Sequence, residues 1–178
     1  MRLKEKYQKV ILAQLQQELK LTNRYAVPRL SKAVVNVGIG RHNKEAAYLE
    51  AVKKNLELIT GQRPVSQKAR RSIAAFKVRQ GEVVGITVTL RGPRLEDFAD
   101  KLINVTLPRV RDFRGLNKKQ VDQNGNLSIG FREQLAFPEI KAEHADIIHG
   151  LEVNLSCGSK NRTAGLAFWQ ALGFPFKK

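Results

Sequence analysis

The sequence has few acidic residues and almost no cysteine or tryptophan. Asp and Glu number 16 against 32 Lys and Arg, which gives a net charge of +16. The single cysteine, Cys157, cannot form an internal disulfide, and together with the three histidines it makes no recognised zinc-ligand spacing. The sequence has no apolar run of about 18 residues and no apolar signal core. We therefore expect neither a membrane span nor secretion, but a cytoplasmic protein.

Motifs for catalysis and cofactor binding are also missing. Gly38 and Gly40 follow a predicted strand, but position 43 is Asn where a dinucleotide fingerprint needs a third glycine. There is no nucleophile elbow, no phosphate loop ending in Gly-Lys-Ser/Thr, and no carboxylate pair with an acid–base rationale. We therefore expect no enzyme, no catalytic residue, no cofactor and no metal site.

The apolar content is sufficient for a folded core. Hydrophobic residues make up 42% of the 178 residues, so we expect a single globular domain over residues 1–178. The excess of positive charge repels itself in the free protein and attracts polyanions. A large anionic partner is therefore expected.

Four segments have apolar residues at helical spacing. They lie at residues 3–21, 43–60, 93–107 and 163–172. We expect Asn43 to cap the second helix and Gly61 to end it. In the third helix we expect Val105 on the apolar stripe and Pro108 as the stop, and Gly173 should end the last helix.

Four segments alternate apolar and polar residues, as half-buried strands do. They lie at residues 32–39, 83–91, 127–131 and 151–157, the third of them after an Asn-Gly turn signal. Their irregular mixing with helices predicts an α+β fold, a two-layer, mainly antiparallel sheet with helices packed on one face. The other face would be exposed and would carry Asn36, Thr87, Thr89 and Arg91. That face is either ordinary solvated surface or a surface for a sugar-phosphate backbone.

Basic residues are concentrated in one block. Residues 62–94 hold eight Lys or Arg and one acid, Glu82, whereas solvated surfaces mix both signs. Part of this block, Lys68 to Gly81, has no sustained periodicity and indicates a long basic loop, in which Phe76 is either a stacking platform or a buried anchor. A second cluster in another connection consists of Arg109, Arg111, Arg114, Lys118 and Lys119.

The two basic segments and the exposed sheet face indicate nucleic acid, and RNA in particular. No homeodomain, zinc-finger or basic-zipper pattern is present, so recognition through shape, 2′-hydroxyls and phosphates is expected. An RNA-modifying enzyme would share the basic surface, and a peripheral membrane protein would share the charge. The membrane alternative fits less well, because the basic residues occupy loops and not one face of a long amphipathic helix.

Three runs closely resemble the bacterial ribosomal protein L5 family. They are Gly61 to Gly92, Leu107 to Asn117 (LPRVRDFRGLN) and Asn124 to Ile140, and the resemblance covers nearly the whole chain in the same order. It implies a non-catalytic constituent of the large ribosomal subunit that binds 5S rRNA and links it to 23S rRNA in the central protuberance. It also implies contacts with peptidyl-site tRNA, with a small-subunit head protein in an intersubunit bridge, and with other central-protuberance proteins.

The resemblance also assigns roles to residues. The family's 5S rRNA contacts match Asn36, Gln62 and Thr89, and with their neighbours the expected set is Asn36, Gln62, Arg63, Lys68, Thr87, Thr89 and Arg91. The family's tRNA-contacting loop corresponds to residues 70–80, with the candidates Arg70, Arg71, Ser72, Phe76, Lys77, Arg79 and Gln80. The second cluster, within residues 109–119, is expected to make an intersubunit or RNA contact.

Overall fold

The structure is a computed structural model that describes residues 3–43, 45–140, 147–159 and 161–177. The chain forms two compact units. Unit 1 comprises Met1–Ala33, Leu90–Ile129 and Asn154–Lys178, and unit 2 comprises Val34–Thr89 and Gly130–Val153. The expectation of a single domain stays a prediction. No helix in the described ranges is long and apolar enough to cross a bilayer.

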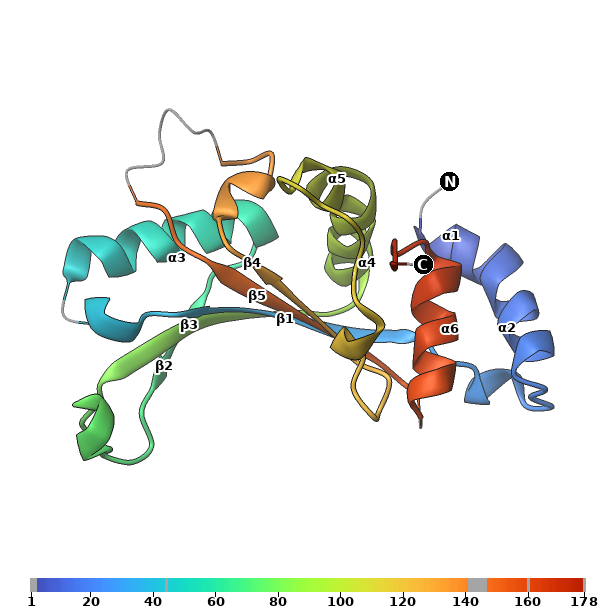
Figure 1. Ribbon diagram of the computed structural model, residues 1–178, viewed down its shortest axis with the longest axis horizontal. Helices are drawn as coiled ribbons and strands as arrows, with labels where there is room; N and C mark the ends of the chain where they lie inside the picture. Colours follow the sequence, from blue (N-terminus) through green and yellow to red (C-terminus); the bar gives the residue numbers. More distant parts are fainter. Residues whose placement is uncertain (1–2, 44, 141–146, 160, 178) are drawn as a thin grey trace. The chain divides into compact units, whose positions relative to one another are not determined.

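The strands form a five-stranded antiparallel sheet in the order β2-β3-β1-β5-β4, with helices packed on it (Figure 1). The strands are β1 (Leu30–Gly38), β2 (Val65–Lys68), β3 (Val83–Leu90), β4 (Leu127–Phe131) and β5 (Leu151–Cys157). The helices are α1 (Leu3–Lys6), α2 (Leu12–Glu18), α3 (Ala46–Thr60), α4 (Pro93–Lys101), α5 (Leu107–Arg109) and α6 (Arg162–Leu172). The predicted α+β class is confirmed.

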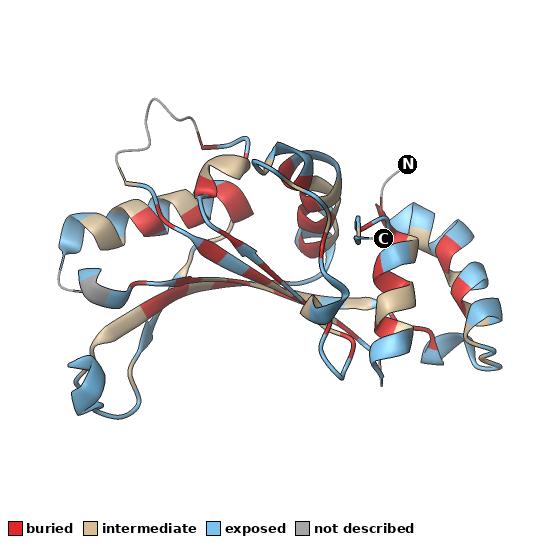
Figure 2. Ribbon diagram, viewed as in Figure 1, coloured by how far each residue is buried: buried red, intermediate tan, exposed pale blue. Residues whose placement is uncertain are grey.

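In unit 2, helix α3 covers one face of the strands. Its apolar stripe buries Val52, Leu56 and Ile59, and the strands bury Val37 of β1 and Ile86 of β3. Burying one such side chain contributes about 1.5–3 kcal/mol, so the alternation along the strands fixes which face meets the helix. Figure 2 shows the buried stretches of α3 and the strands in red, and the connection from β2 to β3 as exposed.

Helix α3 ends as predicted but does not begin as predicted. Gly61 follows it with φ of 64°, a left-handed conformation that glycine adopts without steric cost. The expected cap, Asn43, lies outside the helix, because a 3₁₀ turn at Gly40–His42 delays the start and puts Glu45 at the N-cap position. The amide of Asn43 instead donates to Glu82 Oε2 at 3.4 Å.

A buried polar network in unit 2 ties α3 to the segment before β5. His149 is 4% exposed, and its backbone N–H donates to Gln134 Oε1 at 2.7 Å. Its ring lies 3.2 Å from Gly150 O through Nδ1 and 3.3 Å from Asn55 Nδ2 through Nε2. A neutral ring that donates from Nδ1 and accepts at Nε2 satisfies both partners.

Protonation of His149 should destabilise the protein. Burial lowers the pKa of His149 below its ordinary value of 6.5. The unfolded chain therefore takes up the proton first, so stability is complete above about pH 6.5 and falls as the pH drops toward the lowered folded pKa. Urea unfolding at pH 7.5 and pH 5 measures the difference. His149→Gln should show a smaller loss between these pH values, and an equal loss in both proteins would contradict the neutral-ring assignment.

In unit 1, Gly165 of α6 packs against Gly125 in the turn before β4, so closely that a Cβ added to Gly165 would meet the Gly125 backbone. Asn161 caps α6 by accepting from the backbone N–H of Ala164, and Gly173 ends the helix as predicted. The indole of Trp169 donates to Gly125 O at 2.7 Å, and the Cys157 thiol lies 3.0 Å from the same oxygen. Trp169 and Cys157 are therefore part of the core, at 0% and 7% exposed.

Two helical segments of unit 1 contain a π-helical turn that the sequence pattern did not predict. Tyr7–Ile11 separates α1 from α2, and Leu102–Thr106 separates α4 from α5. A π turn closes i→i+5 hydrogen bonds, so residues within and after it point in other directions than they would in a regular α-helix. Val105 is consequently 38% exposed while Thr106 is buried, contrary to expectation. Pro108 lies inside α5 and does not end the helix, and the first helical segment stops at Glu18, before the predicted end.

Candidate nucleic-acid interface

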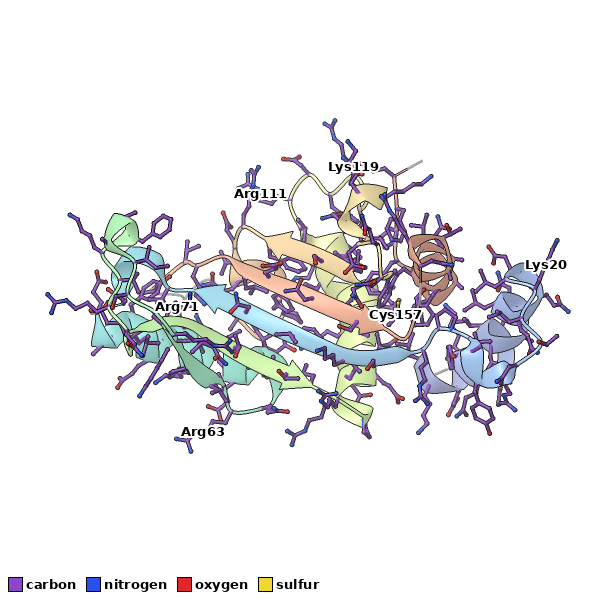
Figure 3. All side chains as sticks on the ribbon, turned by 90° about the horizontal axis from the view of Figure 1, so that it is seen from below. Lys20, Arg63, Arg71, Arg111, Lys119 and Cys157 are labelled. Carbon is purple, nitrogen blue, oxygen red and sulfur yellow. The ribbon has the colours of Figure 1, made fainter. Side chains whose placement is uncertain are left out.

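The strands of unit 2 leave one face without a covering helix, seen toward the viewer in Figure 3. We call it the open face. Its central side chains come from β1, β2 and β3, and are those of Val34, Asn36, Val65, Gln67, Thr87 and Thr89. Along β1 and β3 these positions alternate with buried ones, as the sequence predicted.

Side-chain amides and hydroxyls on the open face are held in place by hydrogen bonds. Gln67 Nε2 donates to Thr87 Oγ1 at 2.9 Å, and Gln62 Nε2 donates to Thr89 O at 3.1 Å. The amide oxygen of Asn36 lies over Gly85, where an added Cβ would be 3.5 Å from it. The side chains of Gln62, Gln67 and Thr87 are therefore hydrogen-bonded before any partner arrives, which lowers the entropy cost of binding.

Two exposed cations lie at the two ends of β2, beside the central side chains of the open face. Arg63 precedes β2 and extends away from it in Figure 3, and Lys68 ends β2. Both side chains are exposed. Neutral donors and acceptors flanked by cations suit a sugar-phosphate backbone, since cations meet phosphates and amides meet hydroxyls and base edges.

The connection between β2 and β3, residues 69–82, is folded and not irregular. We call it the basic loop. Ile73 and Val78 form an antiparallel bridge around a 3₁₀ turn at Ala74–Phe76, and Lys77 closes the turn with φ of 53°. The ring of Phe76 is 76% exposed, so the buried-anchor interpretation is wrong. The stacking interpretation stays a prediction.

Two polar residues hold the basic loop in shape. Ser72 Oγ accepts from the backbone N–H of Gln80 at 2.9 Å. The carboxylate of Glu82, the one acid of the block, accepts from the backbone N–H of Arg79 at 3.0 Å. The cationic side chains of the loop are exposed, and these bonds hold the backbone that carries them.

The second basic cluster and Arg91 belong to unit 1. All five cluster residues are exposed, and Figure 3 shows Arg111 and Lys119 extending outward. Asn117 forms a capping box with Gln120, which fixes the turn that carries Lys118 and Lys119. Strand β3 ends at Leu90, so Arg91 lies one residue beyond the strand that was expected to carry it, and its place on the open face stays a prediction.

The structure thus brings together in unit 2 the six remaining residues of the expected 5S rRNA set and all seven of the tRNA-loop set. Sequence analysis missed Val65 and Gln67 on the open face. The strand that carries them, Val65–Lys68, is too short for alternation to indicate it. Their antiparallel register with Thr87 and Gly85 is visible only in the folded chain.

In comparisons with known proteins, two family models match successive parts of the sequence. The family described as ribosomal protein L5 matches residues 23–79, and the model of that family's C-terminus matches residues 83–176. Relatives named large ribosomal subunit protein uL5 from Roseiflexus sp. (strain RS-1), Roseiflexus castenholzii and Francisella tularensis subsp. novicida are 47%, 46% and 45% identical over 176 residues. Each alignment covers 99% of this chain and 98% of the relative. These matches confirm the resemblance and the prediction of a structural protein and not an enzyme, and the chain belongs to the ribosomal protein L5 family.

Proposed function

We propose that the chain is a cytoplasmic, ribosome-bound protein that holds 5S rRNA in the large ribosomal subunit with the open face of unit 2. The observation that carries the proposal is a set of neutral groups next to the exposed cations Arg63 and Lys68. The set comprises Asn36, Gln62, Gln67, Thr87 and Thr89, and hydrogen bonds hold the side chains of Gln62, Gln67 and Thr87. The relatives are named as large-subunit proteins, which supports the same assignment.

The remaining basic groups serve the other proposed partners. The basic loop contacts peptidyl-site tRNA through exposed cations such as Arg70 and Arg79, with Phe76 available to stack on a base. The cluster within residues 109–119 meets a small-subunit head protein or RNA. The chain also contacts 23S rRNA and other proteins of the central protuberance, and so links 5S rRNA to them. No membrane partner is involved.

Binding of 5S rRNA should depend steeply on salt. If about six cations meet phosphates, affinity falls roughly a thousandfold between about 50 and 200 mM salt through counterion release. Titration of labelled 5S rRNA at several salt concentrations measures the slope. Arg63→Gln and Lys68→Gln should each make the slope shallower by about one.

Lys54→Gln is the matched control for the salt experiment. Lys54 is exposed on α3, the helix that covers the other face of these strands, so the slope should not change. A flat salt response of the wild-type protein would contradict phosphate binding. A slope change as large for Lys54→Gln as for Arg63→Gln would contradict the choice of face.

A further inference from the structure

Unit 1 contains a groove of about 610 Å³ that none of the roles above uses. Its walls come from α1, α2, α4, α6 and the turn before β1. The apolar lining includes Leu3, Val27, Phe168 and Leu172, each at most 7% exposed. Tyr7 also lines it, packs edge-on against Phe168 at 6.3 Å, and donates its hydroxyl to Pro28 O at 3.0 Å. The floor is therefore well packed, and the volume lies in the range of about 300–1,000 Å³ typical of ligand pockets.

The groove is lined by cations that form no ion pair with another residue in the part of the chain that the structure describes. Lys4, Arg24 and Arg29 face one acid, Glu96. Within the described ranges, none of the three cations forms an ion pair or a side-chain hydrogen bond to the protein. Burial raises the pKa of Tyr7, and the charges of Arg29 and Arg24 oppose that rise, which agrees with both guanidinium groups lying near the phenol. The groove therefore has an unneutralised positive wall.

An aromatic ring beside this wall is almost fully exposed. Tyr25 lines the groove and is 92% exposed. It is held by a short 3₁₀ turn, Arg24–Ala26, in which Asn23 Oδ1 accepts from the Tyr25 backbone N–H at 2.9 Å. Val27 directly after the turn is buried. The backbone is thus anchored on both sides of a ring that contacts little of the protein.

We propose that this groove binds a short stretch of single-stranded RNA, with a base stacked on Tyr25 and its phosphates at Lys4, Arg24 and Arg29. Single-stranded RNA sites combine a cationic wall with aromatic faces on which bases stack. An acidic peptide would use the cations but would leave the ring without a partner. The inference rests on the proposed function as an RNA-bound protein, and adds to it an RNA contact in unit 1 that involves no residue of the open face.

The test uses the full chain and a pentauridylate that carries one 4-thiouridine. Photo-crosslinking followed by peptide mapping should place an adduct at the segment that contains Tyr25. Tyr25→Ala should weaken binding at this site about tenfold or more, because stacking supplies much of the affinity. Tyr25→Phe should retain the adduct, since the ring remains. Lys4→Gln should reduce it, whereas Lys9→Gln, which removes an exposed charge from the same helical segment outside the groove, should not.

Two results would overturn the groove assignment. One is an adduct at this segment that survives Tyr25→Ala unchanged or falls equally with Lys9→Gln. The other is a hexaglutamate peptide that displaces the pentauridylate at equal concentration, since the groove would then recognise charge alone. Binding of 5S rRNA by Asn36→Ala, measured in parallel, reports on the open face alone. If the groove variants have no effect while Asn36→Ala weakens 5S rRNA binding, only the groove proposal fails. If the groove variants behave as expected while Asn36→Ala has no effect, only the open-face proposal fails.

Discussion

Gly165→Ala is expected to lower the free energy of unfolding by about 3 kcal/mol, at the upper end of the cost of overpacking a core. In an ordinary helix, replacing Gly by Ala raises the free energy of unfolding by up to about 1 kcal/mol. A decrease would therefore distinguish Gly165 from an ordinary helical position. Here the new Cβ would meet the backbone of Gly125, with its carbonyl oxygen at 2.7 Å. Gly125 cannot retreat easily, because its oxygen already accepts from the Trp169 indole.

Urea unfolding of Gly165→Ala measures this cost, and Gly158→Ala is its control. A Cβ at Gly158 meets nothing within 4 Å and its φ is not in the left-handed region, so its free energy of unfolding should change by less than about 0.5 kcal/mol. A Gly165→Ala protein as stable as the wild type would show that α6 and the turn at Gly125 do not pack as described.

Asn36→Ala combined with Thr89→Ala should weaken 5S rRNA binding about a hundredfold. Each substitution leaves RNA groups without a hydrogen-bond partner at a cost of about 1.4 kcal/mol, and 1.4 kcal/mol is a factor of ten in affinity. Neither change removes a charge, so the salt slope should remain that of the wild type. Filter binding or fluorescence anisotropy with labelled 5S rRNA gives both quantities.

The control for the open face removes charge from the opposite side. Lys53→Gln combined with Lys54→Gln takes two exposed cations from α3. Its affinity should fall far less than a hundredfold, although it changes the net charge by two and the Asn36 and Thr89 variant changes it by none. The reverse order of effects would mean that overall charge, and not the open face, determines binding.

Strands with one buried face could be predicted from the sequence, because burial imposes a period of two on them. The alternation around Asn36 and Thr89 therefore located two candidate residues correctly on the open face. Gln67 was missed because β2 has only four residues and its side chains are mostly exposed. An edge strand of that length is recognised by its pairing with a neighbouring strand, and the spacing of residues along the sequence does not show that pairing.

Helix details depended on packing that the sequence pattern does not encode. The π turn at Leu102–Thr106 moves Thr106 inward and Val105 outward, and a pattern based on 3.6 residues per turn predicts the opposite. Asn43 had the chemistry of a cap, but a preceding 3₁₀ turn placed it elsewhere. The groove in unit 1 could not be predicted at all, because its walls join segments as distant in sequence as Lys4 and Phe168.

The most direct test of the open face is a site-specific crosslink in assembled large subunits. A photoreactive amino acid at Thr89, an exposed open-face position, is compared with the same group at Lys53 on α3. The account predicts 5S rRNA adducts from position 89 and none from position 53. Adducts from position 53 alone, or no 5S rRNA adduct from position 89, would contradict it.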